Sequence, residues 1–238
     1  MFEPVILRKG PFHPAAFDLV VSGERWQPGA DYDALVETAW QGRVEAAAAR
    51  GHRLWDGTHY RVIDIAQAGD GMRIDLGMVS FRYLATYRLL YKENAARGLA
   101  PTHHISTAAM LLTADGHYVF GKRAINGAID LIGGGFQPEE GVPICFENNL
   151  YKEIAEELGV ARTALGEAQG IGIVRSTTSN VLVIAKIETP LTRDGISAAF
   201  ATREDDEMAE PVFIAESEVR DYLRGLTDYR VLVADLIT

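Results

Sequence analysis

Cysteine is almost absent from this sequence: Cys145 is the only one, so no disulfide can form within the chain. Long apolar runs are absent as well, since no stretch approaches the ~20 residues that a membrane-spanning helix needs. The opening residues MFEPVILRKG lack the cationic region and apolar run of a signal peptide. These absences exclude a disulfide-stabilised scaffold and argue against a membrane partner, and we expect a cytoplasmic protein.

Basic residues are scarce relative to acidic ones, with 23 Lys and Arg against 33 Asp and Glu and a formal net charge of −10. Nucleic-acid affinity is built largely from clustered Lys and Arg, so this balance argues against a nucleic-acid partner. Small anionic ligands remain open through local basic residues or a bridging metal. The sequence leaves open whether the chain forms a homodimer.

The 238 residues suit a small domain joined to a larger one. Gly98 and Pro101 punctuate the segment ARGLAPTH, which is the best linker candidate. We therefore predict an N-terminal α/β domain over residues 1–100 and a second domain over 101–238. Hydrophobic periodicity predicts four elements in the first domain: helices at 32–50 and 81–98 and strands at 59–66 and 72–80.

The second half begins with ISTAAMLLTADGHYVFGKR, two apolar runs around Ala114-Asp115-Gly116-His117, which predict a β-hairpin. The short strand IDLI then enters three glycines, Gly133 to Gly135, and a polar loop leads to a helix. The remaining predicted elements are strands at 170–176, 179–188 and 211–215 and a helix near 217–226. Because strands and helices alternate without a regular βαβ repeat, a mixed-sheet α/β/α sandwich is favoured over a doubly wound parallel sheet.

The helix that includes YKEIAEELGV has an acidic face and an apolar face. At 3.6 residues per turn, Glu153, Glu156 and Glu157 fall within an arc of about 100°, with Asn149 on the same side. Gly159 is well placed to end the helix in a left-handed conformation. A row at intervals of four can pack against a sheet: Phe146, Leu150, Ile154 and Leu158.

An isolated acidic patch of this kind is usually a solvated surface. Here the carboxylates crowd the C-terminal end of the helix, where the dipole disfavours negative charge, and only Lys152 is available nearby to compensate. Carboxylate oxygens on a rigid helix suit Mg²⁺ or Mn²⁺. We therefore favour a divalent-metal site over a solvated face.

The hairpin, the turn LIGGGF and the run KEIAEELGV together resemble a Nudix hydrolase, whose signature is G-x5-E-x7-R-E-U-x-E-E-x-G-U with U apolar. The end of that signature matches at Glu153, Ile154, Glu156, Glu157, Gly159 and Val160. The front departs from it: Lys152 replaces arginine, and Gly134 to Glu156 spans 22 positions, four more than in the signature. The earlier glutamate would fall at Ile144, so it is absent or replaced by one of three others: Glu139, Glu140 or Glu147.

Several segments are similar to the UDP-glucose and UDP-galactose pyrophosphatases, a Nudix subfamily with an N-terminal domain: LVETAWQGR, LWDGTHYRV, IDLGMVSFRYLATYR and GIVRSTTSNVLV. This resemblance implies hydrolysis of a nucleoside diphosphate sugar to a nucleoside monophosphate and a sugar 1-phosphate. A Nudix enzyme for ADP-ribose, a dinucleotide or a nucleoside triphosphate is one alternative. A non-catalytic nucleotide sensor is another, although the intact glutamates argue against it.

The Nudix resemblance implies Mg²⁺, or Mn²⁺ in its place, held by Glu153, Glu156 and Glu157. Glu153 and Glu157 are four residues apart and project side by side, so they are the first choice as ligands. The Gly134 carbonyl would also reach the metal or substrate. In the acidic loop 204–207, Glu207 is the choice for a further ligand or the general base, while the other three acids are expected to be solvated.

Substrate phosphates would be bound by basic residues near the glycine turn, and Lys122, Arg123 and Arg175 are the candidates. For each of these three residues, the alternative interpretation is an ordinary cation on the protein surface that binds no ligand. Arg82 is the candidate from the N-terminal domain, against an equally weighted alternative of an intradomain salt bridge. Five further residues are expected to be structural: Trp26, Trp40 and Trp55 in the N-terminal core, and His103 and His104 in the linker.

Overall fold

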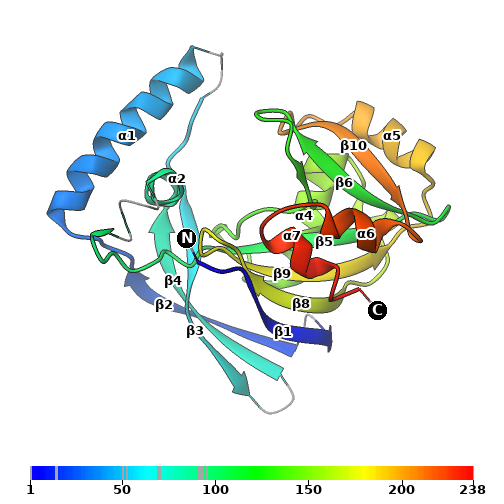
Figure 1. The fold of residues 1–238 in the computed structure, drawn as a ribbon, viewed down its shortest axis with the longest axis horizontal. Coiled ribbons are helices and arrows are strands. Elements are labelled where there is room, and N and C mark those ends of the chain that lie inside the picture. Colours follow the sequence, from blue (N-terminus) through cyan, green and yellow to red (C-terminus); the bar gives the residue numbers. More distant parts are fainter. Residues whose placement is uncertain are drawn as a thin grey trace.

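A computed structural model of the chain describes residues 2–13, 16–49, 51, 53–68, 71–90, 94 and 96–237. The chain forms two mixed β-sheets, a larger one that is built mainly from the second half of the sequence and a smaller N-terminal one (Figure 1). This arrangement confirms the predicted mixed α/β class with an additional N-terminal region. None of the described helices is long and apolar enough to cross a membrane.

The larger sheet has seven strands, in the order β1-β8-β9-β5-β6-β10, with β7 paired to β6. Strands β5 and β9 run parallel, and the other neighbours are antiparallel. The strands are β1 (Val5–Phe12), β5 (Ile105–Leu112), β6 (His117–Arg123), β7 (Ile129–Asp130), β8 (Gln169–Arg175), β9 (Val181–Glu188) and β10 (Met208–Ala215).

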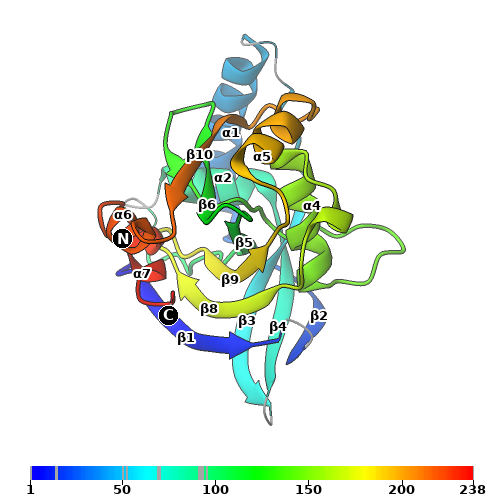
Figure 2. The ribbon, with the colours of Figure 1, turned by 90° about the vertical axis from the view of Figure 1, so that its right-hand side faces the viewer.

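Helices cover both faces of the larger sheet (Figure 2). Side chains alternate along a strand, so in β5 Ala109 and Leu111 face α4 (Phe146–Leu158) and α5 (Arg193–Ala201). Ala108 and Met110 of the same strand instead pack with α6 (Val219–Arg224) and α7 (Tyr229–Val233). Every strand of this central region is therefore buried on both sides, as the predicted α/β/α sandwich requires.

The smaller sheet has the order β2-β4-β3; α2 packs against β4, and α1 packs against α2 (Figure 1). Its elements are β2 (Phe17–Arg25), α1 (Ala30–Ala48), β3 (Thr58–Ala68), β4 (Gly71–Ser80) and α2 (Phe81–Leu89). A small core of its own joins Trp26, Val36 and Leu84. Trp26 and Trp40 are buried as expected, whereas Trp55 is 65% exposed, so its expected place in the core was wrong.

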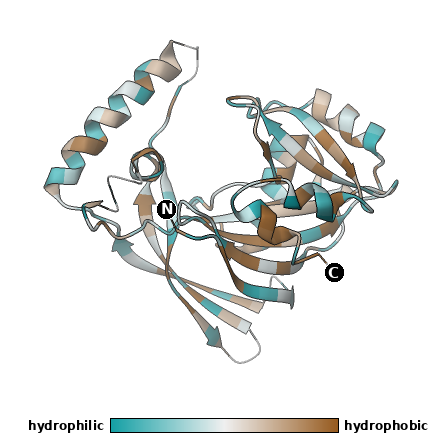
Figure 3. Cartoon of the chain, viewed as in Figure 1, coloured by the Kyte–Doolittle hydropathy of each residue, from teal (hydrophilic) through white to brown (hydrophobic). Residues whose placement is uncertain are grey.

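The two sheets share one continuous core, which includes Val62 and Leu76 of the smaller sheet and Ile105 of the larger one. Figure 3 shows the apolar residues concentrated on the strands, while the outer part of α1 mixes polar and apolar residues. Strand β1 lies in the larger sheet, where it covers the edge of β8 that would otherwise be unpaired. The predicted boundary at residue 100 therefore does not separate β1 from the larger sheet. From β2 onward, the strands before the boundary belong to the smaller sheet and those after it belong to the larger one.

The predicted strands and the hairpin match β3, β4, β5, β6, β8, β9 and β10 closely. The helix predicted at 32–50 is α1, and the one at 81–98 is represented by the shorter α2. Residues 50, 91–93 and 95 of these two predictions lie outside the described residues. Among the described residues, five elements have no counterpart in the prediction: β1, β2, α5, α7 and a single 3₁₀ turn at Arg162–Ala164.

Candidate active site

The glycine turn is held as an additional strand-like segment beside β5. Strand β6 leaves β5 after two residue pairs, and the freed β5 backbone pairs with residues 132–136 instead. The Ala109 N–H donates to the Ile132 carbonyl at 2.7 Å, and the Thr107 N–H donates to the Gly134 carbonyl at 2.9 Å. The Gly134 carbonyl, which we expected to face a metal or substrate, is therefore already engaged in a hydrogen bond to β5.

Helix α4 lies against this segment in a fixed register. Its predicted apolar row is confirmed, since Leu150, Ile154 and Leu158 are fully buried. The Asn149 amide donates to the Thr107 hydroxyl at 2.9 Å, which ties the helix to β5. The helix ends at Gly159 with φ 70° and ψ 12°, as predicted. Thr107 therefore contacts both the glycine segment and the helix, and it fixes one relative to the other.

The carboxylates of α4 gather at the glycine turn. A methyl group on Gly134 would lie only 2.2 Å from Glu153 Oε2, so the carboxylate occupies the space that a side chain at 134 would fill. The Gly133 N–H donates to Glu157 Oε2 at 2.8 Å, and Glu157 is only 3% exposed. Glu156 lies one position before it and is open to solvent.

Burial and mutual repulsion make these carboxylates unusually basic. The pKa of Glu157 is raised to about 9, mainly by burial and to a smaller extent by the charges of Glu153 and Glu207, against the opposing effects of Arg123 and the Gly133 N–H. Burial, followed by the charge of Glu156, raises the pKa of Glu153 to about 7. The pKa of Glu156 is also raised, mainly by burial. When it is ionised, the cluster therefore carries more negative charge than its protein surroundings compensate.

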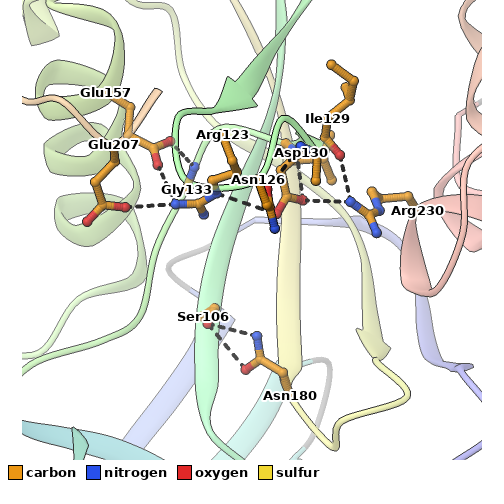
Figure 4. A network of polar contacts seen from close by, with 12 residues as sticks. Ser106, Arg123, Asn126, Ile129, Asp130, Gly133, Glu157, Asn180, Glu207 and Arg230 are labelled. Carbon is orange, nitrogen blue, oxygen red and sulfur yellow. Dashed lines mark hydrogen bonds and ion pairs between the residues drawn. The ribbon is translucent and has the colours of Figure 1, made fainter. Parts of the chain in front are cut away.

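Arg123 at the end of β6 is the cation that joins this cluster to β10. Its Nη1 donates to Glu207 Oε2 at 2.7 Å and lies 3.7 Å from Glu157 Oε1. Its Nε lies 3.8 Å from Asp130 Oδ2. Figure 4 shows Arg123 between the two glutamates and Asp130. Glu207 is thus brought to α4 through Arg123, although its side chain remains 61% exposed.

Asp130, Tyr229 and Arg230 extend the network and were missed by the sequence analysis. Tyr229 Oη donates to Asp130 Oδ1. Arg230 Nη1 donates to the Ile129 carbonyl at 2.6 Å (Figure 4). Burial raises the pKa of Tyr229 well above its usual value, and the charge of Asp130 raises it further. The one available signal was Asp130 itself, a charged residue in the apolar strand before the glycines.

Three other predicted phosphate ligands lie elsewhere or are already paired. Lys122 Nζ lies 2.8 Å from Glu210 Oε1, across the β6–β10 pair. Arg82 forms ion pairs with Glu37 at 3.4 Å and Asp56 at 3.3 Å, which matches the intradomain alternative. The Arg175 guanidinium lies 5.3 Å from the centre of the Phe2 ring. Of the predicted phosphate-binding side chains, only Arg123 contacts a carboxylate of the cluster within the described chain.

The donor atoms fit a hard divalent cation, because all of them are carboxylate oxygens on or near one rigid helix. Within the described residues, no three His, Cys, Asp or Glu side chains already surround one point at ligating distance. The two Glu157 oxygens instead face protein donors, one the Gly133 N–H and the other Arg123. The assignment of Glu153, Glu156 and Glu157 as metal ligands stays a prediction.

No protein-family model matches this chain, and no curated protein matches it. Among solved structures, the chain is similar to the MutT protein from Methanosarcina mazei Go1, with 18% identity over 56% of this chain and 88% of that chain and a TM-score of 0.38. It is also similar to the NUDIX domain of Shewanella oneidensis NrtR complexed with ADP ribose, with 14% identity, 64% and 94% coverage and a TM-score of 0.40. A third similar structure is a NUDIX hydrolase from Nitrosomonas europaea, with 17% identity, 51% and 77% coverage and a TM-score of 0.35. These values describe a distant likeness and assign neither substrate nor catalytic residues.

Two buried histidines lie behind the glycine turn. The His59 and His104 ring centres are 5.2 Å apart, and a methyl group on Gly135 would lie 2.4 Å from His104 Nε2 and 3.1 Å from His59 Nδ1. Both residues are less than 9% exposed, so the expected linker role of His104 was wrong. The pKa of His59 is lowered to about 4, mainly by burial and also by the charge of Arg88. Burial likewise lowers the pKa of His104 well below its usual value.

This pair predicts an acid-sensitive contribution to stability. The folded pKa of His59 is depressed below the ~6.5 of an unfolded chain, so its contribution is present above pH 6.5 and is lost as the pH falls through 4. The total is roughly 3 kcal/mol for His59. We expect His59→Phe, which keeps a ring at the site, to lose less stability than the wild type between pH 7 and 4. Denaturant unfolding at several pH values measures the difference, in which the carboxylate contributions common to both proteins cancel; equal pH slopes would contradict it.

Proposed function

We propose that this chain is a metal-dependent pyrophosphohydrolase of the Nudix type that cleaves a nucleoside diphosphate joined to another moiety. The observation that carries the proposal is the meeting of Glu153, Glu157 and Glu207 around Arg123 and the glycine turn. Such a concentration of acid is destabilising without a cation, and the raised pKa values of Glu153 and Glu157 express that cost. The resemblance to UDP-sugar pyrophosphatases makes UDP-glucose the first substrate to test.

In this mechanism Glu153, Glu156 and Glu157 would hold Mg²⁺ or Mn²⁺. A bound divalent cation neutralises charge on the diphosphate and makes a nearby water more acidic. Glu207 accepts the proton of the attacking water, and its exposed position lets it pass that proton to solvent. A new oxygen–phosphorus bond forms, the bridging phosphorus–oxygen bond breaks, and the products are a nucleoside monophosphate and a sugar 1-phosphate.

Arg123 has two tasks in the proposed reaction. It holds Glu207 at 2.7 Å, so the base stays near α4, and it supplies positive charge beside the position of the diphosphate. The Thr107 contacts to Gly134 and Asn149 keep the glycine turn and the metal-binding helix in register. The chain's own residues therefore position the base, the carboxylates and one cation before substrate arrives.

Product analysis tests this proposal. With Mg²⁺ present, we expect UDP-glucose to yield UMP and glucose 1-phosphate, and ADP-ribose, a dinucleotide and a nucleoside triphosphate to be turned over much more slowly. Chelation of the metal with EDTA should stop the reaction. Preferred turnover of another compound would keep the reaction type and change the substrate. Nucleotide binding without metal-dependent turnover would contradict the enzyme and favour a sensor.

A further inference from the structure

A cavity of about 280 Å³ lies beside the first turns of α4, one helical turn before Glu153. One wall comes from the lengthened loop after the glycine turn, including Gln137 and Val142, and another comes from α4. Tyr60 of β3 forms a third wall, and its N–H donates to the Phe136 carbonyl at 3.0 Å. The cavity therefore joins the smaller sheet, the four additional loop residues and the helix that carries the carboxylates.

The charge of the cavity disfavours a phosphate. Lys152 is the only cation among its lining residues, and it is ion-paired with Glu139, which also lines the cavity. No net positive charge is left to compensate a phosphate group. The part of a ligand that enters this space is therefore uncharged, while the diphosphate lies with the carboxylates and Arg123.

The polar groups of the cavity are free to recognise such a moiety. Within the described part of the chain, the Gln137 and Asn148 side-chain amides have no hydrogen-bond partner, and both residues are exposed to solvent. An amide carries a donor and an acceptor side by side, so it matches the alternating carbonyl and N–H groups on the edge of a nucleobase. The Tyr60 ring supplies a flat surface, and stacking of a base on an aromatic ring contributes about 1–3 kcal/mol.

The size agrees with one end of a nucleotide sugar. Ligand pockets are typically about 300–1,000 Å³, so this cavity suits a single ring system and not a complete nucleotide sugar. We infer that the cavity between Tyr60, the loop at 137–144 and the start of α4 is the nucleobase subsite. This inference rests on the proposed function for the identity of the ligand.

Cys145 makes the subsite testable without turnover, because it is the only cysteine of the chain and it lines the cavity. The full chain is treated with N-ethylmaleimide in EDTA, and the labelling rate is followed by intact mass with UMP or with glucose 1-phosphate present. At about ten times its Kd, UMP should slow labelling about tenfold, because only the unoccupied protein reacts. Glucose 1-phosphate should have no such effect.

Variants separate occupation of the cavity from a distant effect on Cys145. Tyr60→Ala and Asn148→Ala should each raise the Kd for UMP about tenfold, whereas Tyr60→Phe, which retains the ring, and Gln169→Ala, an exposed amide at the start of β8, should not. Calorimetric titration in EDTA gives the Kd values, and thermal unfolding checks that each variant is folded.

The inference would be overturned if UMP saturates the protein without slowing the labelling of Cys145, or if UMP does not bind and labelling is unchanged. It would also be overturned if glucose 1-phosphate alone protects Cys145. Protection by UMP in a protein that hydrolyses no nucleotide would leave the subsite standing and reject the proposed reaction. Hydrolysis of UDP-glucose with no protection of Cys145 by UMP would do the opposite.

Discussion

Glu153→Gln and Glu157→Gln should each lower the turnover of UDP-glucose by roughly 10²- to 10³-fold while the fold is retained. Loss of one carboxylate from a catalytic metal site removes several kcal/mol of charge stabilisation from the transition state, and about 1.4 kcal/mol corresponds to a tenfold change in rate. The amide of glutamine is nearly the same size as the carboxylate, and its oxygen can still accept the Gly133 N–H. Glu167→Gln, at an exposed position after α4, is the matched control and should retain wild-type turnover.

The same variants should lose stabilisation by Mg²⁺, which is measured without any substrate. A cation that binds only the folded protein raises its melting temperature in proportion to the logarithm of its concentration. We expect this increase for the wild type and for Glu167→Gln, and little or none for Glu153→Gln and Glu157→Gln. A variant that loses turnover but keeps the full response to Mg²⁺ would remove that glutamate from the set of proposed ligands.

In EDTA, with no metal bound, the free energy of unfolding should fall with rising pH because of Glu157. The folded pKa of Glu157 is raised to about 9, above the ~4.3 of an unfolded chain, so its contribution to stability is complete below pH 4.3 and is lost as the pH rises through 9. The wild type should therefore lose more stability than Glu157→Gln between pH 6 and 9.5. Parallel melting curves across this range would show that Glu157 is not buried as a carboxylic acid.

The sequence predicts α4 well because every determinant of that helix is local. The apolar row with Leu150 and Ile154 and the acidic face both lie within the 13 residues of the helix. The stop at Gly159 is the next residue. The approach of the carboxylates to the glycine turn is not local, and only the order of motifs in a known family indicated it. Contact of Arg123 with Glu207, 84 positions apart, depends on the pairing of β6 with β10.

The elements that sequence analysis missed have weak local patterns. Strand β1 contains Gly10 and Pro11, which are unfavourable inside a sheet. It lies at the sheet edge, where its irregular register with β8 is tolerated. Helices α5 and α7 have nine and five residues, too few to establish a helical period. The burial of His104 depends on packing against His59 and Gly135, which are distant in sequence. Each of these features depends on packing between residues distant in sequence, which the local sequence pattern does not show.

Gly134→Ala should reduce turnover about 10²-fold with little loss of stability. The new methyl group would lie 2.2 Å from Glu153 Oε2 and 2.4 Å from its Cδ, so the carboxylate must move. The clash involves the far end of a flexible side chain, which can rotate away at low cost to the fold. A displacement of about 1 Å in a catalytic group can cost about 10²-fold in rate. Steady-state kinetics and thermal unfolding measure the two effects separately.

Gly133→Ala is the matched comparison because its clash is with backbone. The methyl group would lie 2.1 Å from the Thr107 carbonyl oxygen, and φ at Gly133 is 153°, where side chains are rarely accepted. This variant should lose roughly 1–3 kcal/mol of unfolding free energy, since β5 cannot rotate away as a side chain can. Gly134→Ala should therefore be stable and slow, and Gly133→Ala should be unstable. If Gly134→Ala keeps wild-type turnover, the position of Glu153 against the glycine turn has no part in the reaction, and the metal-binding role proposed for it fails.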